Sequence, residues 1–236
     1  MKTKPKILIA APTSTYKDYI FLEWYLHAST LTYPNYDIVV CDNSHDTNYH
    51  KKLQAMGIKT FYVSPENKRC HNYVCESQNL LRDYFLAGDY DFWIILEVDQ
   101  FPPRNFIEKL LTAKKDIISI PYFYGYGKAS EPLLYYFYRD KKGVFHRNEK
   151  IDLPMALQFM DGSIKQVYAA GIGCIMISRD IVEKIKFRID PDIEGFSDTP
   201  FYIDLYNNRI NNYIDTSVIS RHYNSDWFLN IDAFKK

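Results

Sequence analysis

Short apolar runs and amphipathic segments alternate along the first hundred residues of the chain. The apolar runs break off in polar or turn-forming residues and predict buried strands within 6–13, 36–46, 59–63 and 91–96. The segments between them predict helices at 18–30, with Asp18 as its N-cap, near 47–56 and near 73–87. This order of strand and helix favours an α/β domain with a mostly parallel sheet and helices on both faces.

The second half of the chain has a less regular pattern. Helices are expected at 103–113, 180–187 and 200–210, and strands at 116–124, within 167–180 and at 213–223. Residues 133–147 are expected to form a hairpin that turns near residues 141–143. No internal repeat or Gly/Ser linker divides the chain, so a single domain over 1–236 is expected, in which residues 101–236 complete a site begun by residues 1–100.

Polar and loop-forming residues gather at the ends of the expected strands. In a parallel α/β sheet the carboxyl ends of the strands lie along one edge, and ligands bind in the crevice just beyond that edge. The sequence therefore predicts a binding site there, built from Pro12, Thr13, Asp42, Asn43, Glu97 and Asp99.

Composition and charge exclude several partners. Lys+Arg and Asp+Glu balance at 29 each, which leaves no basic excess for a nucleic-acid backbone. No stretch approaches the roughly 18 apolar residues of a membrane span, and the apolar run near the N-terminus is too short for a secretion signal. The four cysteines have neither disulfide nor zinc spacing, so reduced thiols and a cytoplasmic location are expected.

The sequence Glu97-Val98-Asp99 places two carboxylates at the end of a buried strand. Unpaired carboxylates are costly away from water, so a partner is expected for them. Mg²⁺ and Mn²⁺ favour oxygen ligands and commonly take one or two protein carboxylates together with substrate phosphates. The alternative is that Glu97 and Asp99 cap the following helix or form surface ion pairs.

The order of several segments resembles one enzyme family. The segments are AAPT (10–13), LTYPNYDIVVCDNSHD (31–46), the carboxylate pair after an apolar strand, and SDTPFYIDLYNNRINNYIDTSVISRHY (197–223). In this order they resemble the GT-A nucleotide-sugar glycosyltransferases, especially the family 2-like group, over residues 6–224. The resemblance implies a Rossmann-like GT-A sheet with a smaller antiparallel region on the acceptor side, in which residues 1–100 bind the nucleotide sugar and residues 101–236 bind the acceptor.

On this resemblance, the first half supplies the nucleotide contacts. Pro12 and Thr13 match the loop that contacts the nucleotide, and Asp42 matches the aspartate that accepts a hydrogen bond from the base, usually uracil. The alternative for Asp42 is a local turn with the residues that follow it. Asn79 lies near the family's Arg-Asn pair, but Gln78 stands where the family has Arg, and Arg69 or Arg82 is the candidate replacement for that positive charge.

The same resemblance implies a metal site. Glu97-Val98-Asp99 takes the place of the family's Asp-x-Asp motif, with Glu in place of the first Asp. Asp99 is then the direct ligand to Mn²⁺ or Mg²⁺, Glu97 assists it, and His222 matches the late histidine that completes the site. The alternative for His222 is a structural histidine on a strand.

Two glycines and three tyrosines are expected near the donor sugar and the acceptor. Gly171 and Gly173 match a segment of the family that lies beside both substrates, where glycine lets a ligand approach the backbone. The alternative is a tight bend in a strand. Tyr122, Tyr124 and Tyr126 are placed on the acceptor side, although core packing explains the first two equally well.

The catalytic base is expected at Asp198. The segment Ser197-Asp198-Thr199-Pro200 matches the family's acidic-Asp-Thr segment at a helix start, with Ser in place of the acidic residue. The alternative is that Asp198 only caps that helix, in which case Glu194 is the substitute base.

Together these residues imply a metal-dependent hexosyltransferase. It would move a sugar from a nucleotide-diphosphate donor, expected to be a UDP-sugar, to a hydroxyl of a glycan, a lipid-linked or another acceptor, with inversion. Two alternatives stay open: an inactive GT-A module that binds a nucleotide or glycan, and a nucleotidyltransferase. The first loop, AAPTSTYKD (10–18), has no glycine, which argues against the nucleotidyltransferase.

Overall fold

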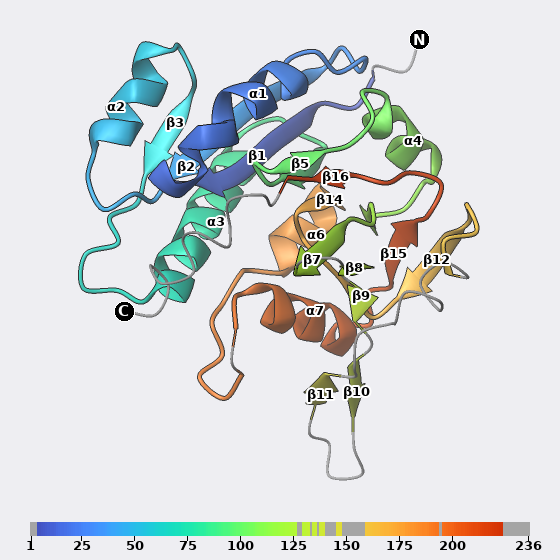
Figure 1. Cartoon of the computed structure of the whole chain (residues 1–236). Coiled ribbons are helices and arrows are strands. Elements are labelled where there is room, and N and C mark those ends of the chain that lie inside the picture. The colour runs from blue at the N-terminus through green and yellow to red at the C-terminus, as the bar shows by residue number, and fades with distance from the viewer. Residues whose placement is uncertain are drawn as a thin grey trace.

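An eight-stranded sheet forms the centre of the molecule in a computed structural model (Figure 1). The structure describes residues 4–126, 129–132, 134–135, 137–139, 145–147, 159–193 and 195–223, with the backbone alone between 123 and 147. The strand order is β12-β15-β6-β14-β4-β1-β2-β3. The strands of this sheet are β1 (Ile7–Thr13), β2 (Tyr36–Asp42), β3 (Thr60–Tyr62), β4 (Phe92–Leu96), β6 (Ile117–Ser119), β12 (Ile164–Val167), β14 (Cys174–Ser178) and β15 (Asn212–Asp215).

Most strands of this sheet are parallel, as the sequence predicts. Strand β1 lies parallel to both β2 and β4, β2 lies parallel to β3, and β6 lies parallel to β15. Strand β14 is antiparallel to its neighbours β4 and β6, and β12 is antiparallel to β15. The predicted α/β fold class is therefore confirmed.

Helices cover both faces of the sheet, and the alternation of side chains along each strand divides the core in two. On one face Ile7 and Ile9 of β1 pack with α1 (Asp18–Ala28), α2 (Asn48–Ala55) and α4 (Phe106–Thr112). On the other, Leu8 and Ala10 pack with α3 (Cys70–Ala87), α6 (Arg179–Lys184) and α7 (Asp198–Asn207). Burial on both faces explains why the central strands are almost continuously apolar.

Short antiparallel pairs accompany the main sheet in the second half of the chain. The pairs are β5 (Gln100–Phe101) with β16 (Arg221–His222), β7 (Phe123–Tyr126) with β8 (Ala129–Pro132), β9 (Leu134–Tyr135) with β13 (Ala169–Ala170), and β10 (Phe137–Arg139) with β11 (Phe145–Arg147). The last pair confirms antiparallel pairing within 133–147, although its expected turn lies outside the described residues. No helix in the described part of the chain has the length and apolar character to cross a membrane.

Three local predictions are wrong. The expected strand at 116–124 is two strands, β6 and β7, because Pro121 between them has no amide hydrogen to donate to a neighbouring strand. The expected strand at 213–223 is two strands, β15 and β16, because residues 215–217 turn: the Asp215 carboxylate accepts a hydrogen bond from the Ser217 amide at 2.9 Å. Asp18 is the first residue of α1 rather than its cap, and its carboxylate accepts hydrogen bonds from Lys52 Nζ at 2.6 and 2.7 Å.

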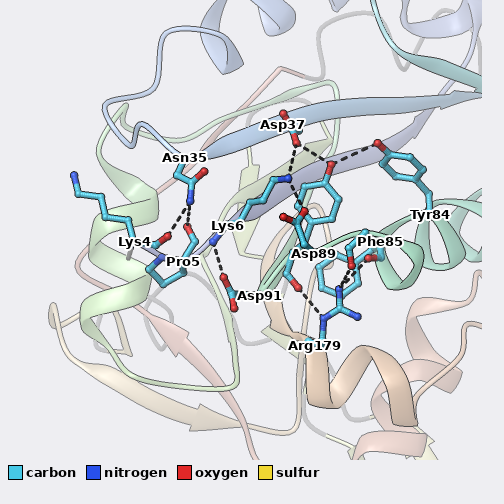
Figure 2. A network of polar contacts seen from close by, with 12 residues as sticks. Lys4, Pro5, Lys6, Asn35, Asp37, Tyr84, Phe85, Asp89, Asp91 and Arg179 are labelled. Carbon is cyan, nitrogen blue, oxygen red and sulfur yellow. Dashed lines mark hydrogen bonds and ion pairs between the residues drawn. The ribbon is translucent and has the colours of Figure 1, made fainter. Parts of the chain in front are cut away.

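Two arginines join α3 and α6 by satisfying the last carbonyl groups of each other's helix, which have no partner within the helix. Arg82 of α3 donates from Nε to the Val182 carbonyl oxygen at 2.8 Å. Arg179, the first residue of α6, donates from Nη2 to the carbonyl oxygens of Phe85 (3.2 Å) and Gly88 (2.5 Å), at the end of α3 (Figure 2). This exchange fixes the two helices side by side on one face of the sheet.

A polar network ties together the amino ends of the strands, at the edge of the sheet away from their carboxyl ends. The Lys6 amide donates to Asp91 at 2.6 Å, and Lys6 Nζ lies 2.5 Å from Asp89 (Figure 2). The Tyr90 hydroxyl donates to Asp37 at 2.8 Å. These contacts connect the amino ends of β1, β2 and β4.

Replacement of Arg179 tests the exchange of arginines between the helices. Arg179→Met should lower the free energy of unfolding by about 2 kcal/mol, because carbonyl groups at the end of α3 lose a charged donor. Urea denaturation of the purified variant measures the change. Lys68→Met, which removes an exposed ion pair with Glu76, is the control and should cost much less. Equal losses in the two variants would contradict this role of Arg179.

Candidate functional site

A cavity lies where the strand order of the sheet reverses. After β1 the chain adds β2 and β3 on one side, whereas β4 lies on the other side of β1. In such sheets the loops at this switch point diverge and leave a crevice at the carboxyl ends of the strands. The cavity is lined by residues at the carboxyl ends of β1 and β4 and by two segments of the second half of the chain. The lining residues include Pro12, Thr13, Glu97, Asp99, Gly171 and Asp198.

Asp99 is the centre of the polar contacts in this cavity. Its side chain is 1% exposed, and its Oδ2 atom forms an ion pair with Nζ of Lys17, in the 3-10 turn η1 (Thr15–Lys17) that follows β1. His222 Nε2, from β16, lies 3.4 Å from the same oxygen. The Tyr223 amide donates to the Asp99 carbonyl oxygen at 2.8 Å and so holds β16 against this loop. The structure thus brings Asp99 and His222 together from opposite halves of the chain.

The pKa values of the two carboxylates in Glu97-Val98-Asp99 are shifted in opposite directions. Burial by itself would raise the pKa of Asp99, but the charges of Lys17 and His222 outweigh it and hold that pKa below its ordinary value. Burial and the adjacent charge of Asp99 raise the pKa of Glu97 to about 7. Asp99 is therefore the firmly ionised member of the pair, as a cation ligand must be.

The donor set around Asp99 suits a hard divalent cation. The second carboxylate oxygen of Asp99, Oδ1, is buried and has no hydrogen-bond partner. Carboxylate oxygen and imidazole nitrogen are both common ligands of Mn²⁺, and an ionised buried oxygen without a partner is costly unless a cation satisfies it. The described residues contain no preformed group of three His, Cys, Asp or Glu side chains that could hold a metal ion. Asp99 thus fits as an anchor for a cation, with His222 beside it.

The two predicted glycines make room for protein side chains. The Tyr122 hydroxyl accepts a hydrogen bond from the Gly173 amide at 3.1 Å. A Cβ atom on Gly171 would overlap that hydroxyl, and one on Gly173 would lie 2.7 Å from Oε2 of Glu97. Gly171 also lines the cavity. Tyr122 therefore explains the glycine at 171, and Tyr122 together with Glu97 explains the glycine at 173. The Tyr122 ring also packs edge-on against His222, with 5.3 Å between the ring centroids.

Asp198 lies at the first turn of α7 and lines the cavity. The residue before it, Ser197, holds the N-cap position, and its hydroxyl donates to Oε1 of Gln78 on α3. Further along α7, Asp204 accepts two hydrogen bonds from Arg188, at 2.8 and 3.0 Å. The contact of Ser197 with Gln78 thus fixes the start of α7, and Asp198 is not the residue that caps it.

The hydrogen bond between Ser197 and Gln78 joins two departures from the resembled family pattern. That pattern has Arg at the position of Gln78 and an acidic residue at the position of Ser197. The structure places these two positions in contact through one hydrogen bond between uncharged side chains.

Several predicted residues lie elsewhere. Asp42 is fully buried and does not line the cavity: its Oδ1 accepts hydrogen bonds from the Ser44 amide (2.9 Å) and hydroxyl (2.6 Å), which is the local turn considered as the alternative. Asn79 faces the chain before α7, donating to the Phe187 carbonyl oxygen at 2.9 Å. Arg82 binds the end of α6, away from the cavity. Glu194 lies outside the described residues, as do the side chains of Tyr124 and Tyr126.

Sequence reasoning missed Lys17. It lies four residues after β1, in a segment with no motif, and only its contact with Asp99, 82 positions later, marks it. The lining residues Tyr16 and Tyr73 were also missed, because a single aromatic residue in a chain with 21 Tyr carries no signal of its own.

Sequence comparisons find no match, whereas structure comparisons find the fold. No family model and no curated protein match the chain. GalNAc-T7, in a structure with UDP, GalNAc and Mn²⁺, aligns over 94% of this chain and 44% of its own, with a TM-score of 0.66 and 12% identity. Residues 1–349 of TarS from S. aureus align over 94% of this chain and 62% of their own length, with a TM-score of 0.52 and 13% identity. This chain therefore spans less than two thirds of the length of either of these two proteins.

A third solved structure matches at nearly equal length. CMP:2-keto-3-deoxy-manno-octonic acid synthetase, in complex with CTP, aligns over 97% of this chain and 96% of its own, with a TM-score of 0.54 and 15% identity. At these identities the similarities concern the fold alone. The sheet, its flanking helices and these similarities define a GT-A, Rossmann-like α/β fold.

Replacement of Gly171 tests the packing around the cavity. Gly171→Ala should lower the free energy of unfolding by about 2 kcal/mol, because the new methyl group overlaps the Tyr122 side chain. The same substitution should cost less in a Tyr122→Leu background, and urea denaturation of the four proteins measures the difference. A cost that is the same in both backgrounds would show that contact with Tyr122 is not the reason for glycine.

Proposed function

We propose that the protein transfers a sugar from a nucleotide-diphosphate donor to a hydroxyl group of an acceptor. The observation that carries this proposal is that Asp99 and Asp198 both line one cavity at the switch point of the sheet. Asp99 offers a carboxylate for a cation, and Asp198 offers a second one, held on a fixed helix, for a proton. The fold similarities to GalNAc-T7 and TarS support the same class of reaction.

Charge balance favours a divalent cation in this reaction. Among the described residues that line the cavity, three are carboxylic acids (Glu97, Asp99 and Asp198) and one is a lysine, Lys17, which already pairs with Asp99. A diphosphate entering this cavity would meet excess negative charge. Asp99 and His222 would hold Mn²⁺ or Mg²⁺, which supplies positive charge for the diphosphate leaving group.

The residues of the chain then have separate tasks. Pro12 and Thr13, the last two residues of β1, line the cavity and would contact the nucleotide. Asp198 would accept the proton of the acceptor hydroxyl as the oxygen bonds to the anomeric carbon and the bond to the diphosphate breaks. Attack from the face opposite the leaving group gives inversion at that carbon. A UDP-sugar is the donor expected from the sequence.

Asp99→Asn tests the cation site. The variant should fold, because the amide keeps the shape of the side chain, and it should lose metal-stimulated transfer by at least about 100-fold, because it removes the ionised ligand. Product formation from UDP-, GDP- and dTDP-sugars with and without Mn²⁺ measures the loss, and thermal melting checks the fold. Normal turnover in this variant would contradict the assignment of Asp99 as the ligand of the cation.

Asp198→Asn tests the base. Donor binding, measured by calorimetry with UDP and Mn²⁺, should stay within about twofold, whereas turnover should fall by about 10²–10⁴-fold, the usual contribution of general base catalysis. Asp204→Asn, on the same helix but bound to Arg188, is the matched control: it should lose stability and keep turnover. A wild-type protein that binds donor and forms no product would instead favour the inactive binding module.

One observation favours nucleotidyl transfer as a second candidate. The CMP:2-keto-3-deoxy-manno-octonic acid synthetase shares the fold over nearly its whole length, and Lys17 places a basic residue on the first loop of this chain. The absence of glycine from that loop argues for the glycosyl reaction. Release of pyrophosphate from a nucleoside triphosphate, with a sugar acid as acceptor, would establish the second candidate.

A further inference from the structure

Lys17 holds a position in which it competes with a metal ion. Its Nζ atom contacts Oδ2 of Asp99, and both side chains line the cavity. The lysine side chain is 19% exposed and the aspartate 1%, so Lys17 is the more accessible member of the pair. Lys17 therefore neutralises Asp99 in the absence of any ligand, which avoids the cost of a buried unpaired charge.

An ammonium group and a divalent cation compete for a single buried carboxylate. Both are positive, and their repulsion over a few ångströms is weakly screened in a buried site. Lysine also has a flexible four-carbon chain, so its ammonium group can move without a change in the backbone of η1. Arrival of a cation at Asp99 would therefore release the Lys17 ammonium group into the cavity.

We infer that Lys17 is an exchangeable counter-ion: it pairs with Asp99 while the site is empty, and pairs with a phosphate of the donor once a divalent cation has taken Asp99. The inference rests on the proposed function for the class of donor. Because the ammonium group stays in the cavity, it meets the diphosphate beside the cation, where an ion-paired hydrogen bond to phosphate is strong. The same lysine thus opposes metal binding and favours nucleotide binding.

Lys17→Met separates these two effects, because methionine keeps an apolar chain and removes the charge. Mn²⁺ should bind the variant at least about tenfold more tightly than wild type in the absence of nucleotide. UDP should bind at least about tenfold more weakly at saturating Mn²⁺. Calorimetry measures both affinities. Lys52→Met is the matched control: Lys52 pairs with Asp18 at the start of the adjacent helix, is exposed, and should change neither affinity.

A measurement on the wild-type protein covers the case in which Lys17→Met does not fold. Acylation of lysines, followed by mass spectrometry, reports how accessible each ammonium group is. Labelling of Lys17 should increase several-fold when Mn²⁺ is added and decrease again when UDP follows, while labelling of Lys52 stays constant.

Each outcome decides the inference. Opposite changes in the two affinities, or the rise and fall of Lys17 labelling, support exchange. Unchanged or weaker Mn²⁺ binding in Lys17→Met, constant labelling of Lys17, or a wild-type protein that binds no Mn²⁺ overturns it. The metal measurements need no sugar donor, so a failure of exchange is distinct from a failure of glycosyl transfer, which product formation by the wild-type protein tests.

Discussion

The buried carboxylate of Asp99 is the constraint on which the site depends. An ionised side chain that is only 1% exposed requires a positive partner. Lys17 supplies that partner from the loop after β1, and His222 reaches the same oxygen from the other end of the chain. The requirement therefore connects three segments that are distant in sequence, and it fixes which groups face the cavity at the point where the strand order reverses.

The residues that pack around Asp99 hold the groups of the site in place. Tyr122 fills the space that side chains at Gly171 and Gly173 would occupy, and its ring supports His222 from one side. On another wall of the cavity, the hydrogen bond between Ser197 and Gln78 holds the start of α7, where Asp198 lines the cavity. Rigid support of this kind is what positioned acid–base groups need, because small displacements of reacting groups lower rates strongly.

The hydrogen bond between Ser197 and Gln78 also bears on how departures from the resembled family pattern are interpreted. Taken singly, Gln in place of Arg and Ser in place of an acidic residue each suggest a lost function. In the structure the two residues contact each other through a hydrogen bond between uncharged groups, so neither of them leaves an unpaired charge at the start of α7. Arg82, a candidate substitute for that Arg, instead binds the end of α6.

The sequence alone determined the α/β class, the parallel strands and the edge at which polar residues gather, because burial on both faces leaves long apolar runs and parallel strands end together. It also indicated Glu97, Asp99, Gly171 and Asp198, which line one cavity. Only the tertiary structure decided that Asp99 pairs with Lys17, that Asp42 forms a local turn, and that the glycines accommodate Tyr122. Those outcomes depend on contacts between residues far apart in the chain, and local patterns of polarity carry no information about such contacts.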